Sequence, residues 1–309
     1  MNYENNTFSN VPTPKPLSAT RHFFQSQSII AKLAFLALTL IVFIILLKVI
    51  TKVMIKVLAP SKSPYLLKDL KPANVPTTIS QNPNVANSIP IIRSTNQKEG
   101  IAFTYSLWMY VHGIPEITEK QYHQVFFKGN KNTPITRDNH PDYSVLPRKV
   151  FRTLGKDLSG INYPDNGPGL YITQIKSKGN HADSLGLALV MNTYRNILES
   201  IVVPDISLKK WLCVTIRVMG SNIDIYINGI IVKRHTLDDV PKQNYGDVFI
   251  SANKGFSGSI SKMQYFNRAL DAKEIYSIVQ SGPNMTVDES LLVTPPYYSS
   301  DWYFADDKI

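Results

Sequence analysis

The strongest pattern in the sequence is an unbroken apolar run near its start. Residues 33–47 read LAFLALTLIVFIILL, in which Thr39 is the one polar residue. Apolar residues continue beyond Lys32 and Lys48, so that the run extends over 29–50. A helix of this length is about 33 Å long, close to the roughly 30 Å of hydrocarbon in a bilayer. The pattern therefore predicts a single transmembrane helix whose flanking lysines reach the two interfaces.

Two other kinds of segment also contain apolar runs, a buried core helix and a cleaved signal peptide, and both fit this run less well. A buried core helix would carry a polar stripe, and residues 33–47 carry none. A cleaved signal peptide would place a short apolar region near the start, followed by small residues at a cleavage site. Here 28 residues precede the run, and LLKVITKVMIKVL ends and follows it. We therefore favour a membrane anchor.

A basic stripe follows the apolar run. Lys48, Lys52 and Lys56 recur at every fourth position, so they share one face if the helix continues to about residue 59. Such a stripe suits the anionic headgroups of a lipid bilayer, at about 1 kcal/mol for each lysine. The alternative is a helix flank that is only exposed to solvent. Because Lys62 adds to the basic residues after the run, the positive-inside rule leans weakly towards a cytoplasmic C-terminal body.

The segments on either side of the anchor, which we place at 29–59, show no sustained periodicity. Residues 1–28 are polar and contain proline, which predicts a disordered N-terminal segment. Residues 60–98 hold six prolines and many Asn, Ser and Thr residues. This composition predicts an extended, proline-rich stalk.

From Gly100 onwards the apolar residues recur with a period of two. Apolar and polar residues alternate over 212–218 and again over 223–228. Asn228-Gly229 then indicates a type I′ hairpin, because both positions need a positive φ, and 230–234 returns. These residues predict a three-stranded antiparallel meander.

Other short runs of this kind fill 99–282, about ten in all. Asp271, with Glu274 three residues later, predicts the start of one short helix with a capping box. Gly282-Pro283 predicts its end. Many short strands with a single helix predict an all-β antiparallel sandwich.

Four segments of this body resemble those of a known superfamily. They are FTYSLWMYV from 103, KKWLCVTIRV from 209, IDIYINGIIV from 223 and GDVFISANKGFSGSISKMQYFNRALDAKEIYSIVQSG from 246. Their order is similar to that of the concanavalin A-like lectin/glucanase superfamily, and within it to the laminin-G-like jelly rolls. The resemblance implies a jelly-roll sandwich over 99–282, in which Trp211 packs the core. The residues that would define this fold are Trp108, Trp211, Asn228, Gly229 and Gly258.

The resemblance raises glycoside hydrolysis as an activity, which needs two carboxylates. Glucanase members carry them as Glu-x-Asp-x-(x)-Glu on one strand, and this chain has no such motif. A phosphate-binding loop, a nucleophile elbow and a Cys–His pair are also missing from the sequence. We therefore predict a non-catalytic domain whose loops or sheet face bind glycan or protein.

Calcium is the one metal that the resemblance suggests, bound by loop oxygens. The candidate ligands are Asp165, Asn180 and Asp183. Asp-Asn-Gly sequences such as 165–167 are also ordinary turn chemistry, and we favour that interpretation. The histidines show no zinc-ligand spacing. No cofactor is therefore predicted.

The net charge of +10 divides unevenly along the chain. Residues 1–72 hold nine basic and two acidic residues, so the excess is densest around the anchor. A basic stretch at 128–160 is typical of a solvated or protein-contacting inserted loop. We therefore predict no nucleic-acid partner. The single cysteine, Cys213, excludes an intramolecular disulfide.

The C-terminal segment 283–309 holds one basic and five acidic residues and is rich in aromatic side chains. Either it packs on the sandwich or it contacts a partner. Its candidate contact residues are Tyr297, Tyr298, Trp302, Tyr303 and Phe304.

The whole layout is similar to that of membrane-anchored virion proteins of large DNA viruses, which meet a capsid or shell protein. In that setting the anchor would lie in an internal viral membrane. The alternatives are a cell-surface, lectin-like glycan-binding or adhesion protein and, third, a degenerate glycanase.

Overall fold

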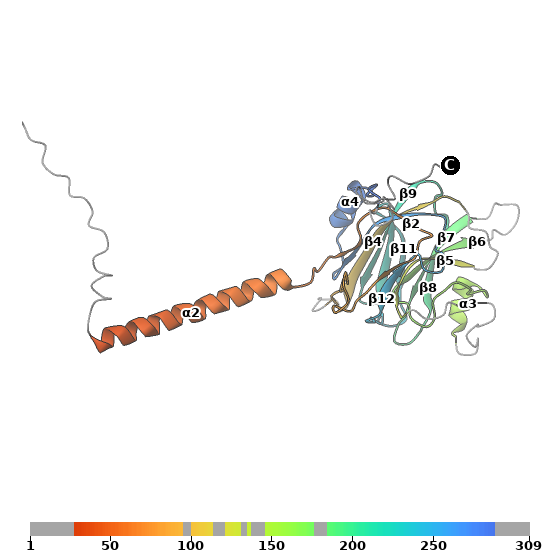
Figure 1. The fold of residues 1–309 in the computed structure, drawn as a ribbon. Coiled ribbons are helices and arrows are strands. Elements are labelled where there is room, and N and C mark those ends of the chain that lie inside the picture. Colours follow the sequence, from red (N-terminus) through yellow and green to blue (C-terminus); the bar gives the residue numbers. More distant parts are fainter. Residues whose placement is uncertain are drawn as a thin grey trace, which may run out of the picture. The chain divides into compact units, whose positions relative to one another are not determined.

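The computed structural model describes residues 28–94, 100–113, 121–130, 135–136, 146–175 and 184–287. The chain divides into two units, Met1–Ala59 and Pro60–Ile309. The first unit contains one described helix, and the second contains a β-sandwich (Figure 1).

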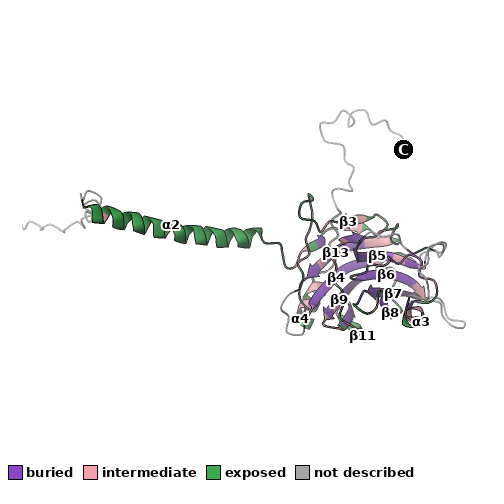
Figure 2. Cartoon of the chain, turned by 90° about the horizontal axis from the view of Figure 1, so that it is seen from below, coloured by how far each residue is buried: buried purple, intermediate pink, exposed green. Residues whose placement is uncertain are grey.

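Helix α2 (Ile29–Leu58) makes up the described part of the first unit, and none of its residues is buried (Figure 2). The two threonine hydroxyls inside it donate to carbonyl oxygens four residues earlier: Thr39 to Phe35 at 2.8 Å and Thr51 to Leu47 at 2.7 Å. These hydroxyls therefore need no water as an acceptor. Within the described residues, α2 is the one helix long and apolar enough to cross a membrane, and a signal sequence would pass the same test.

The sandwich consists of two antiparallel sheets, as predicted. The seven-stranded sheet has the order β1-β13-β4-β9-β10-β11, with β2 also paired to β13. Its strands are β1 (Tyr65–Leu67), β2 (Lys71–Pro72), β4 (Ala102–Val111), β9 (Trp211–Met219), β10 (Asn222–Ile227), β11 (Ile230–Thr236) and β13 (Gly258–Phe266).

The six-stranded sheet has the order β3-β12-β5-β6-β7-β8. Its strands are β3 (Thr77–Ile79), β5 (Tyr122–Gly129), β6 (Gly169–Ile175), β7 (Ser184–Met191), β8 (Glu199–Val203) and β12 (Asp247–Ile250). Two short helices, α3 (Arg148–Leu154) and α4 (Ala272–Gln280), complete the described part of this unit.

The predicted meander is confirmed, and its alternation forms one wall of the core. Val214, Ile216 and Val218 of β9 are fully buried in the main apolar cluster. Asn228 and Gly229 turn the chain with φ of 51° and 83°, as a type I′ turn requires. Each buried side chain of this size contributes roughly 1.5–3 kcal/mol.

The same alternation corrects the role predicted for Trp211. Because Leu212 points into the core, its neighbour Trp211 lies on the opposite face, half-buried beside Tyr110 at 5.6 Å between ring centroids. Trp108 also points away from the core cluster. Gly258 has the tight approach expected of it, because a Cβ there would lie 2.0 Å from the Tyr110 carbonyl oxygen.

The predicted stalk is wrong for its described part. Strands β1 and β2 pair with β13, and β3 pairs with β12, so residues 65–79 extend both sheets. Leu66 and Ala73 are buried. Strands of two or three residues are too short to show a period of two, and an edge position tolerates the proline of β2. The prolines in this segment therefore lie within or directly before short edge strands.

The basic stretch at 128–160 contains α3, which covers part of the six-stranded sheet. Val150 and Leu154 of α3, with Leu158 and Ile161, form a second apolar cluster with Tyr171 of β6. Helix α3 also contacts β8 (Figure 1). This segment therefore adds a small core on the outer face of the sheet.

Helix α4 begins as the sequence predicted. The Asp271 carboxylate accepts from the backbone N–H of Glu274 at 2.8 Å, and the Glu274 carboxylate accepts from the backbone N–H of Asp271 at 3.0 Å. This reciprocal pair is the predicted capping box. Ile275 is buried beside Tyr226 and Phe266, which fastens α4 to the sandwich.

Candidate functional site

A cavity of about 220 Å³ lies where the two sheets and several loops meet. Its floor is aromatic and comes from the seven-stranded sheet: Phe103 and Tyr105 of β4 and Tyr265 of β13. Lys128 of β5 enters it from the six-stranded sheet. The remaining polar and aromatic lining comes from loops, through Arg93, Tyr194, Gln243, Asn244 and Tyr245.

The aromatic floor is closely packed. The rings of Tyr105 and Tyr265 have centroids 5.0 Å apart, and Phe103 meets Tyr105 edge-on at 5.9 Å. The Tyr265 hydroxyl donates to the Ile92 carbonyl oxygen at 3.0 Å. Burial raises the pKa of both tyrosines above its usual range, so both phenols stay neutral. The floor is therefore an uncharged apolar surface.

Lys128 is the unusual residue of the cavity, because it is a lysine only 7 % exposed. Its neighbour Phe127 stacks on Phe249 at 4.9 Å on one face of the sheet, so strand alternation turns Lys128 to the other face. The ammonium donates to the Gly246 carbonyl oxygen at 2.6 Å. Burial lowers the pKa of Lys128 to about 8, although the Asp247 carboxylate acts in the opposite direction.

Buried and half-buried asparagines hold the loops around the cavity. The Asn166 carboxamide accepts from the Tyr171 hydroxyl at 2.5 Å and donates to the Asn162 carbonyl oxygen at 2.6 Å. Asn192 donates to the Pro164 carbonyl oxygen at 2.7 Å, and Asn244 donates to that of Lys128 at 3.0 Å. Satisfied buried networks of this kind fix loop positions. The frame of the cavity is therefore preformed.

The rim of the cavity presents flat, exposed aromatic surfaces. Tyr245 is 87 % exposed and Tyr194 is 68 % exposed. Two residues with amide side chains, Gln243 and Asn244, also line the cavity. Apolar and aromatic surfaces with a few fixed polar groups are typical of a small-ligand site.

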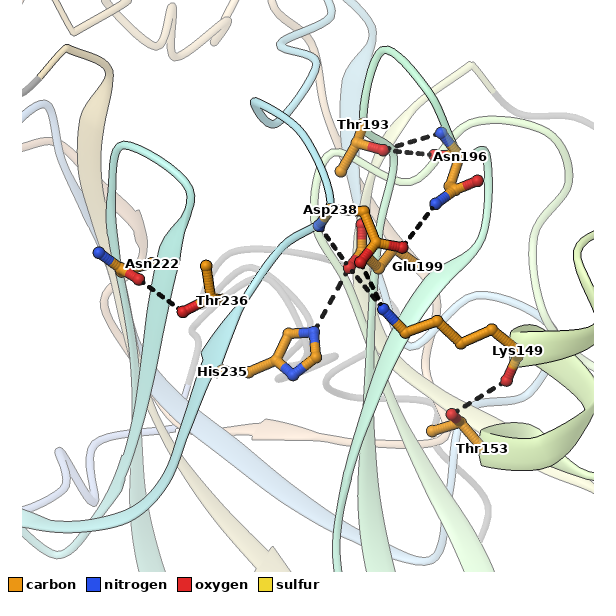
Figure 3. A network of polar contacts seen from close by, with 9 residues as sticks. All are labelled: Lys149, Thr153, Thr193, Asn196, Glu199, Asn222, His235, Thr236 and Asp238. Atoms are coloured by element: carbon orange, nitrogen blue, oxygen red, sulfur yellow. Dashed lines mark hydrogen bonds and ion pairs between the residues drawn. The ribbon is translucent and has the colours of Figure 1, made fainter.

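A second polar cluster, on another part of the sandwich, has no such cavity (Figure 3). The Glu199 carboxylate accepts from the Asp238 backbone N–H at 2.9 Å and faces Lys149 at 3.5 Å and His235 at 3.4 Å. Lys149 also pairs with the Asp238 carboxylate at 2.7 Å. The space beside this cluster measures about 10 Å³, scarcely one water. We interpret the cluster as a structural network of polar contacts that links α3, β8 and β11.

Of the three candidate calcium ligands, Asp165 lies within the described residues. Asp165 accepts a hydrogen bond from Asn130 at 3.0 Å, and its neighbour Asn166 is fully buried in the loop frame. Asn180 and Asp183 lie outside the described residues. No group of three or more His, Cys, Asp or Glu side chains with metal-binding geometry occurs in the described ranges.

None of the other predicted residues is among the described residues that line the cavity. Lys32, Lys48, Lys52 and Lys56 are exposed on α2, in the first unit. The aromatic residues predicted at 297–304 lie outside the described part of the chain. Sequence reasoning also missed the cavity. The one signal for it was a lysine at an inward position of the aromatic run QVFFK.

These features define the class of the second unit: a jelly-roll sandwich with loops gathered around a cavity. Residues 165–276 match a family model described as the concanavalin A-like lectin/glucanases superfamily. The sandwich is therefore a concanavalin A-like, laminin-G-like domain, and the resemblance seen in the sequence is confirmed. A search of curated protein sequences finds no match to this chain.

Solved structures similar to the chain include receptor-binding domains of botulinum neurotoxins. The C/D mosaic domain has 14% identity over 59% of this chain and 36% of that chain, with a TM-score of 0.37. The type G domain has 15% identity over 71% and 46%, with a TM-score of 0.37. The serotype D domain in complex with N-acetylneuraminic acid has 14% identity over 68% and 41%, with a TM-score of 0.40. The chain spans less than half of each, so nothing about its ligand follows from them.

Proposed function

We propose that this chain is a membrane-anchored, non-catalytic module that binds a glycan in the cavity. The observation that carries the proposal is a preformed cavity with an aromatic floor, an exposed tyrosine rim and fixed amide groups. A sugar ring has apolar faces and a polar edge, and this lining offers a partner to each. Long loops on a rigid sandwich commonly carry binding sites.

The lining also favours binding over hydrolysis. Glycoside hydrolysis uses two carboxylates that flank the scissile bond. The described lining of the cavity contains no Asp or Glu side chain. A glycan held here would therefore meet a lysine, an arginine, amides and phenols, none of which supplies the paired acid and base.

The proposal is tested with the full chain in detergent. Binding to a panel of immobilised glycans should give a saturable signal with at least one structure. Tyr245→Ala should weaken it about tenfold, because the exposed ring loses its stacking surface. Tyr276→Ala is the matched control, since Tyr276 is 60 % exposed on α4 and does not line the cavity.

Two outcomes would contradict glycan binding at this site. One is a panel without any hit, and the other is an equal loss in the Tyr245 and Tyr276 variants. A negative panel combined with co-purification of a shell protein would favour the virion layout instead. Replacing Trp302 and Tyr303 by alanine should then release that partner.

The anchor is tested separately. Alkaline carbonate extraction of membranes should leave the full-length chain in the pellet, because α2 is apolar over its whole circumference across 33–47. Release into the supernatant would overturn the anchor. A mature chain that mass measurement shows to lack the residues before and within α2 would identify a signal sequence.

A further inference from the structure

The polar wall of the cavity is cationic. An ammonium group has three N–H donors, and the structure gives that of Lys128 one hydrogen-bond acceptor, the Gly246 carbonyl oxygen. Among the described residues no carboxylate forms an ion pair with it. The nearby Asp247 carboxylate accepts instead from the Gln81 backbone N–H at 2.8 Å. Two of the three Lys128 donors therefore have no hydrogen-bond acceptor among the described residues.

A buried cation that lacks a counterion is costly, because water no longer solvates it. Lys149 is an example of a lysine with a structural role. Its side chain is half-exposed and pairs with two carboxylates. Lys128 is more deeply buried and has a single neutral acceptor. Perturbed, buried charges beside a cavity are typical of functional sites.

Arg93 places a second cation at the same cavity. It follows β3 in the sequence, is exposed, and lines the cavity. In the described part of the chain, no hydrogen bond or ion pair engages its guanidinium. A guanidinium presents a planar fork of donors that fits a carboxylate or a sulfate group.

We infer that the cavity is specific for an acidic sugar, whose carboxylate or sulfate group lies between Lys128 and Arg93. This inference rests on the proposed glycan-binding function and names the chemical class of its ligand. The ring of the sugar would lie on the aromatic floor, where the neutral phenols of Tyr105 and Tyr265 do not repel the anion. The bound anion would supply the counterion that Lys128 lacks.

The test compares matched glycans on the detergent-solubilised full chain by calorimetry. One oligosaccharide is used in three forms: neutral, carboxylated on its terminal sugar, and sulfated on that sugar. An acidic form should bind at least tenfold more tightly than the neutral form. Comparison of the two acidic forms identifies the preferred group.

Two variants test whether Lys128 and Arg93 produce the preference for the acidic form of the oligosaccharide. Lys128→Met and Arg93→Ala should each reduce the ratio of acidic-form affinity to neutral-form affinity at least fivefold. Arg93 is exposed, so its variant should remain folded. Lys149→Met is the control, because it removes a lysine outside the cavity. Equal affinity for neutral and acidic forms, or a preference that survives both cavity variants, would overturn the inference. Absence of binding by all three forms would instead count against the proposed function.

The pH dependence gives an independent readout. Deprotonation of Lys128 should lower the affinity for the acidic sugar about tenfold between pH 7 and 9, while the neutral sugar is unaffected. Lys128→Met should remove this dependence. Burial raises the pKa of Tyr105 and Tyr265 away from this window. The other charged or titratable groups around Lys128 are Asp247, Arg93, Tyr194 and Tyr245. Affinity that is constant in the native chain across this range would contradict a role for the ammonium.

Discussion

Two buried charges in the sandwich have opposite surroundings. Glu199 is 3 % exposed and faces Lys149 and His235, with almost no space beside it. Lys128 is 7 % exposed, donates to one carbonyl oxygen and lines a cavity of about 220 Å³. The first charge faces basic side chains of the protein itself, whereas the second has no carboxylate partner among the described residues. A buried charge thus indicates function only when both its partners and its neighbouring space are known.

Asp224 is a second example of a neutralised charge. Its carboxylate accepts from Arg217 of β9 and Arg234 of β11, each at 2.6 Å. Burial acts to raise the pKa of Asp224, but the hydrogen bonds from Arg234 and Arg217 outweigh it and hold the pKa below its usual value. Arg217 also donates to the Leu270 carbonyl oxygen at 3.1 Å. This ion triad therefore links three strands to the segment before α4.

The largest expected change in the free energy of unfolding concerns Asp224, a buried carboxylate that is paired with two arginines. Asp224→Ala should lower the free energy of unfolding by about 3 kcal/mol, because it leaves Arg217 largely buried without a counterion. Urea unfolding followed by tryptophan fluorescence measures the change. Asp239→Ala, at a half-buried position outside the triad, serves as a control and should lower stability by less, because it loses only one hydrogen bond from the Val240 backbone N–H. A loss below about 1 kcal/mol would show that the triad is only a surface feature.

Lys128→Met should change the free energy of unfolding in the opposite direction. At pH 7 it should raise the free energy of unfolding by about 2 kcal/mol, because it removes the cost of burying a cation. The native pKa of about 8 lies below that of an unfolded lysine. The cost is therefore complete below pH 8 and disappears as the pH rises towards about 10.4.

Unfolding of the native chain and the Lys128 variant at pH 7 and pH 10 tests this directly. Their stabilities should differ at pH 7 and converge at pH 10, apart from packing differences. A variant that is less stable than the native chain at pH 7 would mean that Lys128 is neutralised after all. The contrast with Glu199 would then fail.

Glu199→Gln sharpens the comparison with a smaller change. The amide keeps an acceptor for the Asp238 backbone N–H but loses the charge that faces Lys149 and His235. We expect a loss of about 1 kcal/mol, since Lys149 retains its pair with Asp238. Binding of the matched glycans should not change. A change in their affinities would show that the Glu199 cluster influences binding in the cavity.

The smallest effect concerns a partly exposed charge, the Glu274 carboxylate. Glu274 pairs with Arg268, and this hydrogen bond, followed by the one from the Asp271 backbone, lowers the pKa of Glu274 to about 2. Its contribution is present above about pH 4.5 and is lost as the pH falls towards 2. Glu274→Gln should cost only about 0.5 kcal/mol at pH 7, because solvent screens the pair. Thermal unfolding at pH 7 and pH 3 should show the difference shrinking in acid.

Much of the architecture was readable because its signals are local. The apolar run of α2, the alternation of β9 and β10, the Asn228-Gly229 turn and the Asp271 capping box each occupy a few consecutive residues. Backbone sterics and side-chain periodicity decide such features within one segment. The edge strands β1, β2 and β3 were missed because two or three residues carry no period.

The sequence by itself determined the apolar helix, the all-β sandwich and the absence of a paired-carboxylate motif, because these depend on patterns within short segments. Only the tertiary structure decided which charges are functional candidates. Lys128 and Arg93 are 35 positions apart in the sequence, and their cavity also needs residues from β4, β13 and the 243–245 loop. The energy of a buried charge depends on its solvation and its neighbours, and the chain supplies both only when distant segments pack together.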